Sequence, residues 1–173
     1  SDTELSTSKI TVTDEFWFDT ENRTDLIKNP TDTASYIIDT DGTDTWMTNC
    51  STGQRDATST DSSQITDWCV GNLTSYGKIT FRVGSYSFSY RVNLASYIAI
   101  EGEHDSNCIP KTILLGNNGI FNITLKSAVT LKNLQLYGND GSAELVWARS
   151  SPGCLLENIW FTATYGNGLY VEE

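Results

Sequence analysis

Two runs in the second half of the chain repeat each other, and this repeat constrains the fold more than any other sequence feature. Residues 129–136, VTLKNLQL, align with residues 154–161, CLLENIWF, at an offset of 25 residues. The earlier run 98–102, IAIEG, aligns with residues 129–133 at an offset of 31. Internal periods in this range are typical of solenoids, in which each repeat forms one coil.

Short segments with β propensity surround these repeats, and no helical pattern interrupts them. They are residues 78–83, 86–94, 97–100, 112–115, 119–125, 129–137, 144–148, 154–161 and 169–171. This pattern predicts an all-β fold, a right-handed parallel β-helix in which strands hydrogen-bond to their equivalents in the next coil. Asn133 and Asn158 then occupy equivalent turns, because Asn tolerates left-handed backbone and can bond its stacked neighbour. The alternative is a β-sandwich with a coincidental repeat.

One helix is predicted ahead of these strands, near residues 61–73. Asp61 is a suitable N-cap, and the apolar residues that follow it are three or four positions apart. Strands are also expected at 35–38 and around 45–47, within a polar segment, 39–60, that otherwise reads as loop. The domain is expected to span residues 34–173, with the helix capping its first coil.

Residues 1–33 read as an extended N-terminal arm. Their stretch 9–18, KITVTDEFWF, alternates apolar and polar residues at its start, which predicts a strand. A lone strand must pair with something, either this domain or a neighbouring subunit. The residues that would carry this assembly strand are Ile10, Val12, Phe16 and Phe18.

Residues 77–86 (GKITFRVGSY), 97–103 (YIAIEGE), 111–114 (KTIL) and 129–138 follow the predicted helix in order. This succession resembles the N-terminal coils of the right-handed parallel β-helix proteins of the pectate-lyase-like superfamily. The resemblance covers residues 35–173 and implies the fold with its capping helix. It does not fix the function, because the superfamily includes polysaccharide lyases and hydrolases, phage tailspikes and non-catalytic surface proteins.

Charge and hydropathy exclude two classes of partner. Lys and Arg number 11 against 22 Asp and Glu, which gives a formal net charge of -11, so no nucleic acid or anionic lipid partner is expected. No apolar run reaches the length of about 20 residues that a membrane span needs. The chain begins at Ser1 with no basic, apolar leader, which suggests a processed or trimmed product.

Four cysteines indicate an oxidising compartment. No C-x-x-C pair is present and there is one histidine, so a zinc site is not expected. We expect two disulfides, Cys50 with Cys69 and Cys108 with Cys154, although four cysteines allow three connectivities and the alternative is free buried thiols. Disulfides favour an extracellular, cell-surface or virion-surface location.

Four sequons could carry glycans on such a protein. A chain this rich in Ser and Thr produces a similar number by composition alone, so the count does not establish glycosylation. The acceptor residues are Asn22, Asn49, Asn72 and Asn122.

Candidates for catalysis or metal binding are sparse. The sole histidine, His104, stands beside Asp105 and could act as a general base, but an exposed turn residue is the favoured interpretation. Glu144 with Arg149 reads as a solvated salt bridge. The remaining scattered acids of the coil region, Asp140 and Glu157, complete no carboxylate pair.

A cation and a sugar were also weighed as ligands. Asp39, Asp41 and Asp44 are weak candidates for Ca²⁺, without a full EF-hand loop, so no metal or other cofactor is expected. Four tryptophans and the tyrosines could stack on sugar rings, although aromatic ladders inside the coils are the stronger expectation. The tryptophans are Trp46, Trp68, Trp147 and Trp160.

The sequence therefore favours a non-catalytic structural protein, extracellular or on a virion surface, that polymerises with copies of itself into a filament or appendage. Strand donation by the arm and end-to-end stacking of coils would hold the polymer together. The alternative is the N-terminal fragment of a polysaccharide-acting β-helix enzyme or phage tailspike. A third reading is a carbohydrate-binding module, with glycans or cell-surface polysaccharide as partners and aromatic residues presented outward on one face.

Overall fold

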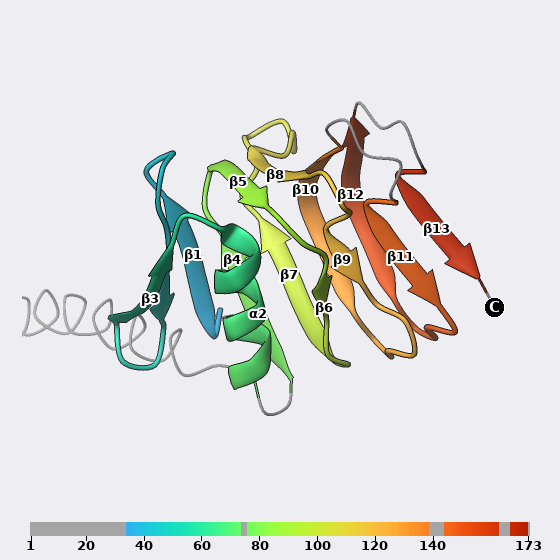
Figure 1. Cartoon of the computed structure of the whole chain (residues 1–173), viewed down its shortest axis with the longest axis horizontal. Helices are drawn as coiled ribbons and strands as arrows, with labels where there is room; N and C mark the ends of the chain where they lie inside the picture. The colour runs from blue at the N-terminus through green and yellow to red at the C-terminus, as the bar shows by residue number, and fades with distance from the viewer. Residues whose placement is uncertain (1–33, 74–75, 139–143, 163–166, 173) are drawn as a thin grey trace, which may run out of the picture. The chain divides into compact units, whose positions relative to one another are not determined.

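The computed structural model describes residues 34–73, 76–138, 144–162 and 167–172. They form a β-solenoid of about three turns with one helix, which confirms the predicted parallel β-helix fold (Figure 1). The elements are β1 (Tyr36–Thr40), β2 (Thr45–Asn49), β3 (Gln54–Ser59), α2 (Ser62–Asn72), β4 (Gly77–Phe81), β5 (Gly84–Phe88), β6 (Val92–Asn93), β7 (Ile98–Gly102), β8 (Thr112–Gly116), β9 (Phe121–Asn122), β10 (Thr130–Gly138), β11 (Val146–Arg149), β12 (Leu155–Thr162) and β13 (Leu169–Glu172).

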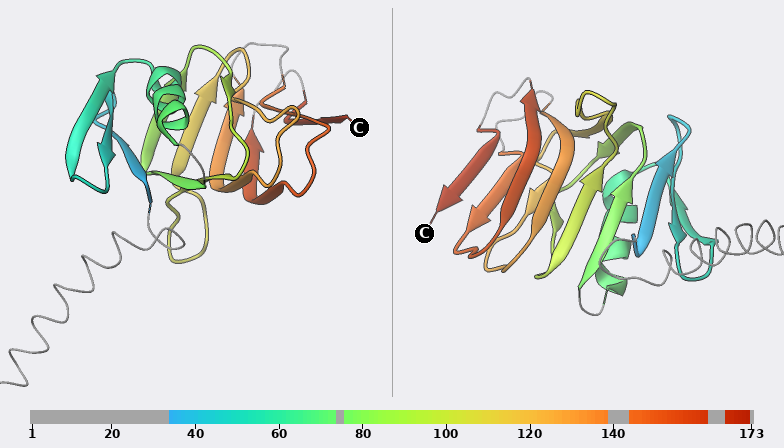
Figure 2. Two further views of the ribbon diagram at one scale, coloured as in Figure 1. Left: turned by 90° about the horizontal axis from the view of Figure 1, so that it is seen from below. Right: turned by 180° about the vertical axis from the view of Figure 1, so that it is seen from behind.

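The repeats found in the sequence are the strands that pair in the structure. β4, β7, β10 and β12 run parallel and side by side, as the view from behind shows (Figure 2). Ala99 of β7 is in register with Thr130 of β10, the predicted offset of 31, and Thr130 is in register with Leu155, the predicted offset of 25. A second face is formed by β5, β8 and the C-terminal half of β10, and a third by β6, β9, β11 and β13.

Antiparallel strands and the helix precede the coils. β1 pairs in parallel with β4 and antiparallel with β2, and β2 pairs antiparallel with β3. Most of the segment 39–60 was expected to be loop, yet it contains β3. This strand escapes the sequence pattern because QRDATS has no apolar alternation and is largely exposed.

Helix α2 covers the N-terminal end of the solenoid (Figure 1). It begins after Asp61, as predicted, where the Asp61 carboxylate accepts a hydrogen bond from the Ser63 backbone N–H at 2.9 Å. Ile65 and Cys69 face the core, while Trp68 lies at the edge of the buried face, 39% exposed and edge-on to Tyr36.

The core consists of three rows of inward side chains that stack from coil to coil. One row runs Tyr36, Ile79, Ile100, Leu131, Leu156; the second runs Tyr86, Leu114, Leu136, Phe161; the third runs Val92, Phe121, Val146, Leu169. All are buried apart from Leu156, Phe161 and Leu169 in the last coil. Alternation of apolar and polar residues thus fixes which face of each strand turns inward.

The expected position of the tryptophans is wrong. The aromatic cluster inside the coils consists of Phe81, Tyr86, Phe88 and Phe121, with ring centroids 5.0 to 6.4 Å apart. Trp46, Trp68, Trp147 and Trp160 are all partly or largely exposed, because each stands at an outward or edge position.

Candidate functional site

The last coil in the described part of the chain, β12 with β13, has a core side that no described residue covers, and we call it the terminal coil. Val171 is in register with Ala148, but 68% of Val171 is exposed against 7% of Ala148. Likewise Phe161 is 38% exposed, whereas its partner Leu136 is fully buried. The inward rows therefore end on apolar side chains that no described residue covers.

The outer edges of the terminal coil are equally open. Within the described ranges, β12 pairs only with β10 and β13 only with β11, so both strands present unpaired backbone groups on their far side. The other end of the domain differs, since α2 covers the core there and β3 offers a polar edge strand. The two ends of the solenoid are therefore chemically unlike.

A polar pocket of about 350 Å³ lies over β4 and β7, lined by Lys78, Thr80, Val83, Glu101, Gly102, Glu103 and His104. Its charges neutralise one another. Lys78 Nζ lies 2.5 Å from Glu101 Oε2, and Arg82 Nη1 lies 2.6 Å from Glu103 Oε1. Both carboxylates of the pocket therefore already have a cation as partner.

His104 and Asp105 do not form the acid–base pair considered from the sequence. His104 Nδ1 lies 2.8 Å from the backbone oxygen of Asp105, not from its carboxylate. Asp105 Oδ1 instead accepts hydrogen bonds from the backbone N–H groups of Asn107 and Ile109, both at 2.9 Å. The bond from Ile109, more than any other contact, lowers the pKa of this carboxyl. Asp105 therefore organises a turn.

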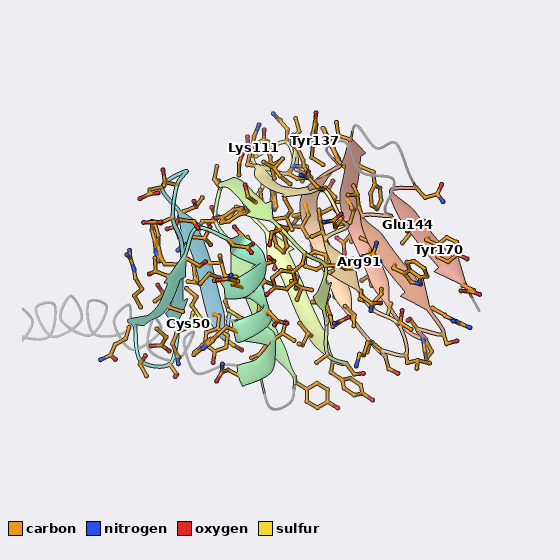
Figure 3. The ribbon with its side chains drawn as sticks, in the orientation of Figure 1. Cys50, Arg91, Lys111, Tyr137, Glu144 and Tyr170 are labelled. Carbon is orange, nitrogen blue, oxygen red and sulfur yellow. The ribbon has the colours of Figure 1, made fainter. Side chains whose placement is uncertain are left out.

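Glu144 and Arg149 are not partners, contrary to the predicted salt bridge. Arg149 Nε lies 3.5 Å from Glu172 Oε2, and Glu144 Oε2 lies 3.8 Å from Arg91 Nη2 (Figure 3). Glu157 pairs with Lys132, with 3.0 Å between Oε1 and Nζ. Asp140 lies outside the described residues.

The acidic residues proposed for Ca²⁺ serve a turn. Asp41 Oδ1 accepts hydrogen bonds from the backbone N–H groups of Thr43 and Asp44, each at 2.9 Å, and Asp39 Oδ1 accepts one from Thr40 N. In the described part of the chain, no three Asp, Glu, His or Cys side chains lie together as a metal site.

Neither predicted disulfide is present, because each thiol lies against a different neighbour. Cys69 is fully buried, with Sγ 3.5 Å from Met47 Sδ, whereas Cys50 Sγ faces the Thr48 carbonyl. Cys108 is exposed, and Cys154 Sγ lies 3.7 Å from the carbonyl oxygen of Lys126. The four thiols are free in this structure.

Three of the four sequon asparagines lie among the described residues. The side-chain amides of Asn49, Asn72 and Asn122 donate to Asp56 Oδ2, to the Trp68 carbonyl and to Asn93 Oδ1, at 3.1, 2.8 and 2.7 Å. Asn72 is the exposed one, at the end of α2. Asn22 lies outside the described residues, as do Ile10, Val12, Phe16 and Phe18.

No helix in the described ranges has both the length and the hydropathy needed to cross a membrane. In comparisons with known proteins, no family model, no curated protein and no solved structure matches the chain.

Proposed function

We propose that this domain is a non-catalytic structural module that assembles with copies of itself through the terminal coil. The observation that carries this proposal is the uncovered core of β12 and β13, where Phe161, Leu169 and Val171 are 38%, 38% and 68% exposed. Apolar side chains and unpaired strand edges in one place are typical of surfaces where a further strand is added.

The difference between the two ends specifies what the partner must supply. The N-terminal end is covered by α2 and ends in the polar strand β3, so it presents no apolar coil for stacking. We propose instead that the arm of one copy, with Ile10, Val12, Phe16 and Phe18, adds as a strand along the outer edge of β12 in the next copy. Repetition of this contact is heterologous, so it builds a ring or an open filament.

The extracellular, cell-surface or virion-surface setting stays a proposal, although the four free thiols remove the disulfides from which it was argued. The proposed superfamily is the pectate-lyase-like one, which the parallel coils and the asparagine-bearing turns support. The alternative, the N-terminal part of a polysaccharide-acting enzyme or tailspike, would cover the same side chains with further coils. Its enzymatic form lacks support from the described residues, whose candidate carboxylates are held by cations or turn amides.

The molecular mass in solution tests the proposal. Val171→Lys places a charge on the uncovered core, and Leu125→Lys is its matched control, a 74% exposed leucine in a turn elsewhere. By light scattering, we expect multiples of 19.1 kDa for wild type and Leu125→Lys, and monomers for Val171→Lys and for a chain lacking residues 1–20. A monomeric wild type would refute self-assembly, and a truncated chain that still assembles would refute strand donation.

A further inference from the structure

Two tyrosine rings lie against each other on the surface of the first two coils. Tyr76 immediately precedes β4 and Tyr97 immediately precedes β7, and the pairing of Gly77 with Ile98 places them side by side. Their ring centroids are 4.9 Å apart and their planes are tilted by 44°, so the rings are in van der Waals contact. Tyr76 is 70% exposed and Tyr97 is 47% exposed, so solutes can reach both rings.

The backbone at these positions is left-handed in successive coils. The angle φ is 41° at Tyr76 and 63° at Tyr97, and it is 53° at Ala128 and 70° at Gly153, which hold the equivalent positions before β10 and β12. A bulky residue rarely adopts this conformation, and the two later coils make the turn with the smallest side chains. The turn therefore does not require an aromatic ring, and the fold carries two of them there at a conformational cost.

Backbone hydrogen bonds fix the two rings in place. The Tyr97 N–H donates to the Ser127 carbonyl oxygen at 2.9 Å, and the Gly77 N–H donates to the Tyr97 carbonyl oxygen at 3.4 Å. In the described part of the chain, no other two tyrosine rings are in contact with each other. The remaining tyrosines with an aromatic neighbour meet a different residue type, namely Tyr36 with Trp68, Tyr86 with Phe81, and Tyr170 with Trp147.

Two phenols in contact suit oxidative coupling. A one-electron oxidant removes an electron and the hydroxyl proton from each tyrosine, which leaves two phenoxyl radicals. A C–C bond then forms between the ring carbons next to the two hydroxyl oxygens, and the hydrogens on those carbons move to the oxygens and restore the phenols. The pair loses two electrons and two protons, and one molecule of hydrogen peroxide takes these up to become two molecules of water. Because the rings are already in contact, the coupling needs no encounter between chains.

We propose that Tyr76 and Tyr97 are a modification site, at which a haem peroxidase with hydrogen peroxide forms a dityrosine cross-link between the first two coils. The cross-link ties β4 to β7 and closes a loop over residues 76–97, so it restricts the unfolded chain as a disulfide does. It supplies a covalent bond between coils that the four free cysteines do not form. The proposal does not depend on self-assembly, because both rings belong to one chain and lie on other coils than the terminal coil.

The experiment treats the 173-residue chain with a plant haem peroxidase and hydrogen peroxide. Trypsin then cuts after Arg55, Lys78, Arg91 and Lys111, so each tyrosine of the pair is the only one in its peptide, 56–78 or 92–111. After reduction of any disulfide, we expect mass spectrometry to find these two peptides joined, with a mass two hydrogen atoms below their sum. Dityrosine fluorescence should appear together with this product, and the urea midpoint of the oxidised chain should rise.

Phenylalanine variants locate the reaction. Tyr76→Phe and Tyr97→Phe keep the ring but form no phenoxyl radical there, so we expect each to lose the joined peptides and the rise in the urea midpoint. Tyr90→Phe is the matched control, a 38% exposed tyrosine with no described aromatic ring against it, and it should behave as wild type.

Isotope labelling distinguishes a bond within one chain from a bond between chains. When labelled and unlabelled chains are mixed in equal amounts before oxidation, the joined peptides should be wholly labelled or wholly unlabelled. Joined peptides of mixed labelling would place the bond between chains and overturn the proposal. Wild type that forms no joined pair of 56–78 with 92–111, or that couples mainly through other tyrosines, would overturn it as well.

Discussion

Asn158 Nδ2 donates a hydrogen bond to Asn133 Oδ1 across one coil, at 2.9 Å. Both residues have left-handed backbone, with φ of 51° and 56°, and they occupy equivalent positions in β12 and β10. The same Asn158 amide also donates to the Cys108 carbonyl at 2.7 Å, and Asn133 Nδ2 donates to Glu101 Oε1 at 3.3 Å. These amides join three successive coils where two faces of the solenoid meet.

We expect Asn133→Ala to destabilise the domain by about 1–3 kcal/mol, because Asn133 is buried and its loss leaves polar partners unpaired in a strained turn. Asn133→Gly should cost less, since glycine accepts the positive φ without strain. Urea unfolding measures both. Equal stability of Asn133→Ala and wild type would show that the asparagine bond contributes nothing.

Gly102 lies one coil earlier, against the same turn. A Cβ at Gly102 would lie 2.3 Å from the Asn133 backbone oxygen and 2.7 Å from Thr112 Cβ. We expect Gly102→Ala to lower the free energy of unfolding by about 1–3 kcal/mol, because backbone must move to admit the methyl group. Gly71→Ala is the control in the same assay, with no atom near its added Cβ and a helical position that favours alanine. A Gly102→Ala variant as stable as Gly71→Ala would contradict the close approach.

How far the sequence predicts this fold depends on the face in question. The offsets of 31 and 25 residues can be recognised in the sequence because Ile100, Leu131 and Leu156 stack inward and are all branched aliphatic residues. The pairing of Lys78 with Glu101 cannot be predicted from the sequence. The offset between β4 and β7 is 21 residues, and coils of unequal length hide the register between these strands. Local patterns therefore specify strands, and coil lengths decide which outward side chains meet.

The outward positions of Trp147 and Tyr170 could have been predicted from the alternation of side chains along their strands. Each ring stands between two apolar residues of its strand, Trp147 between Val146 and Ala148 and Tyr170 between Leu169 and Val171. Because neighbouring side chains of a strand point to opposite faces, both rings point away from the core. The opposite was expected because aromatic ladders inside β-helix coils are common. The exposed core of the terminal coil could not be predicted from the local sequence. Phe161 points inward like its buried partner Leu136, and the two residues differ only in what covers them.

Asp61 makes stability depend on pH in a defined direction. Burial would raise the pKa of Asp61, but hydrogen bonds from Ser63 and Ser89 outweigh it and lower the pKa. A carboxyl with a lowered folded pKa stabilises the fold above its unfolded pKa of about 3.9 and loses this as pH falls through the folded value. The stability advantage of wild type over Asp61→Asn, which caps without titrating, should therefore shrink below about pH 4. An advantage independent of pH would contradict this role.

The thiols should react in a fixed order. Burial raises the pKa of Cys69 to about 12, so its thiolate is scarce and shielded, whereas Cys108 is exposed. With iodoacetamide at about pH 8, we expect mass spectrometry to show Cys108 modified first and Cys69 last. Denaturation without reductant should then expose four alkylatable thiols. A count of two or none would mean that disulfides form after all.

Hydrogen exchange along the outer edge of β12 tests the central claim most directly. At high protein concentration, we expect these amides to exchange as slowly as those of β10, which lie between paired strands. Dilution should then accelerate exchange in β12 and leave β10 unchanged. Fast exchange in β12 at every concentration would mean that no copy adds a strand there, and the proposed assembly through the terminal coil would be wrong.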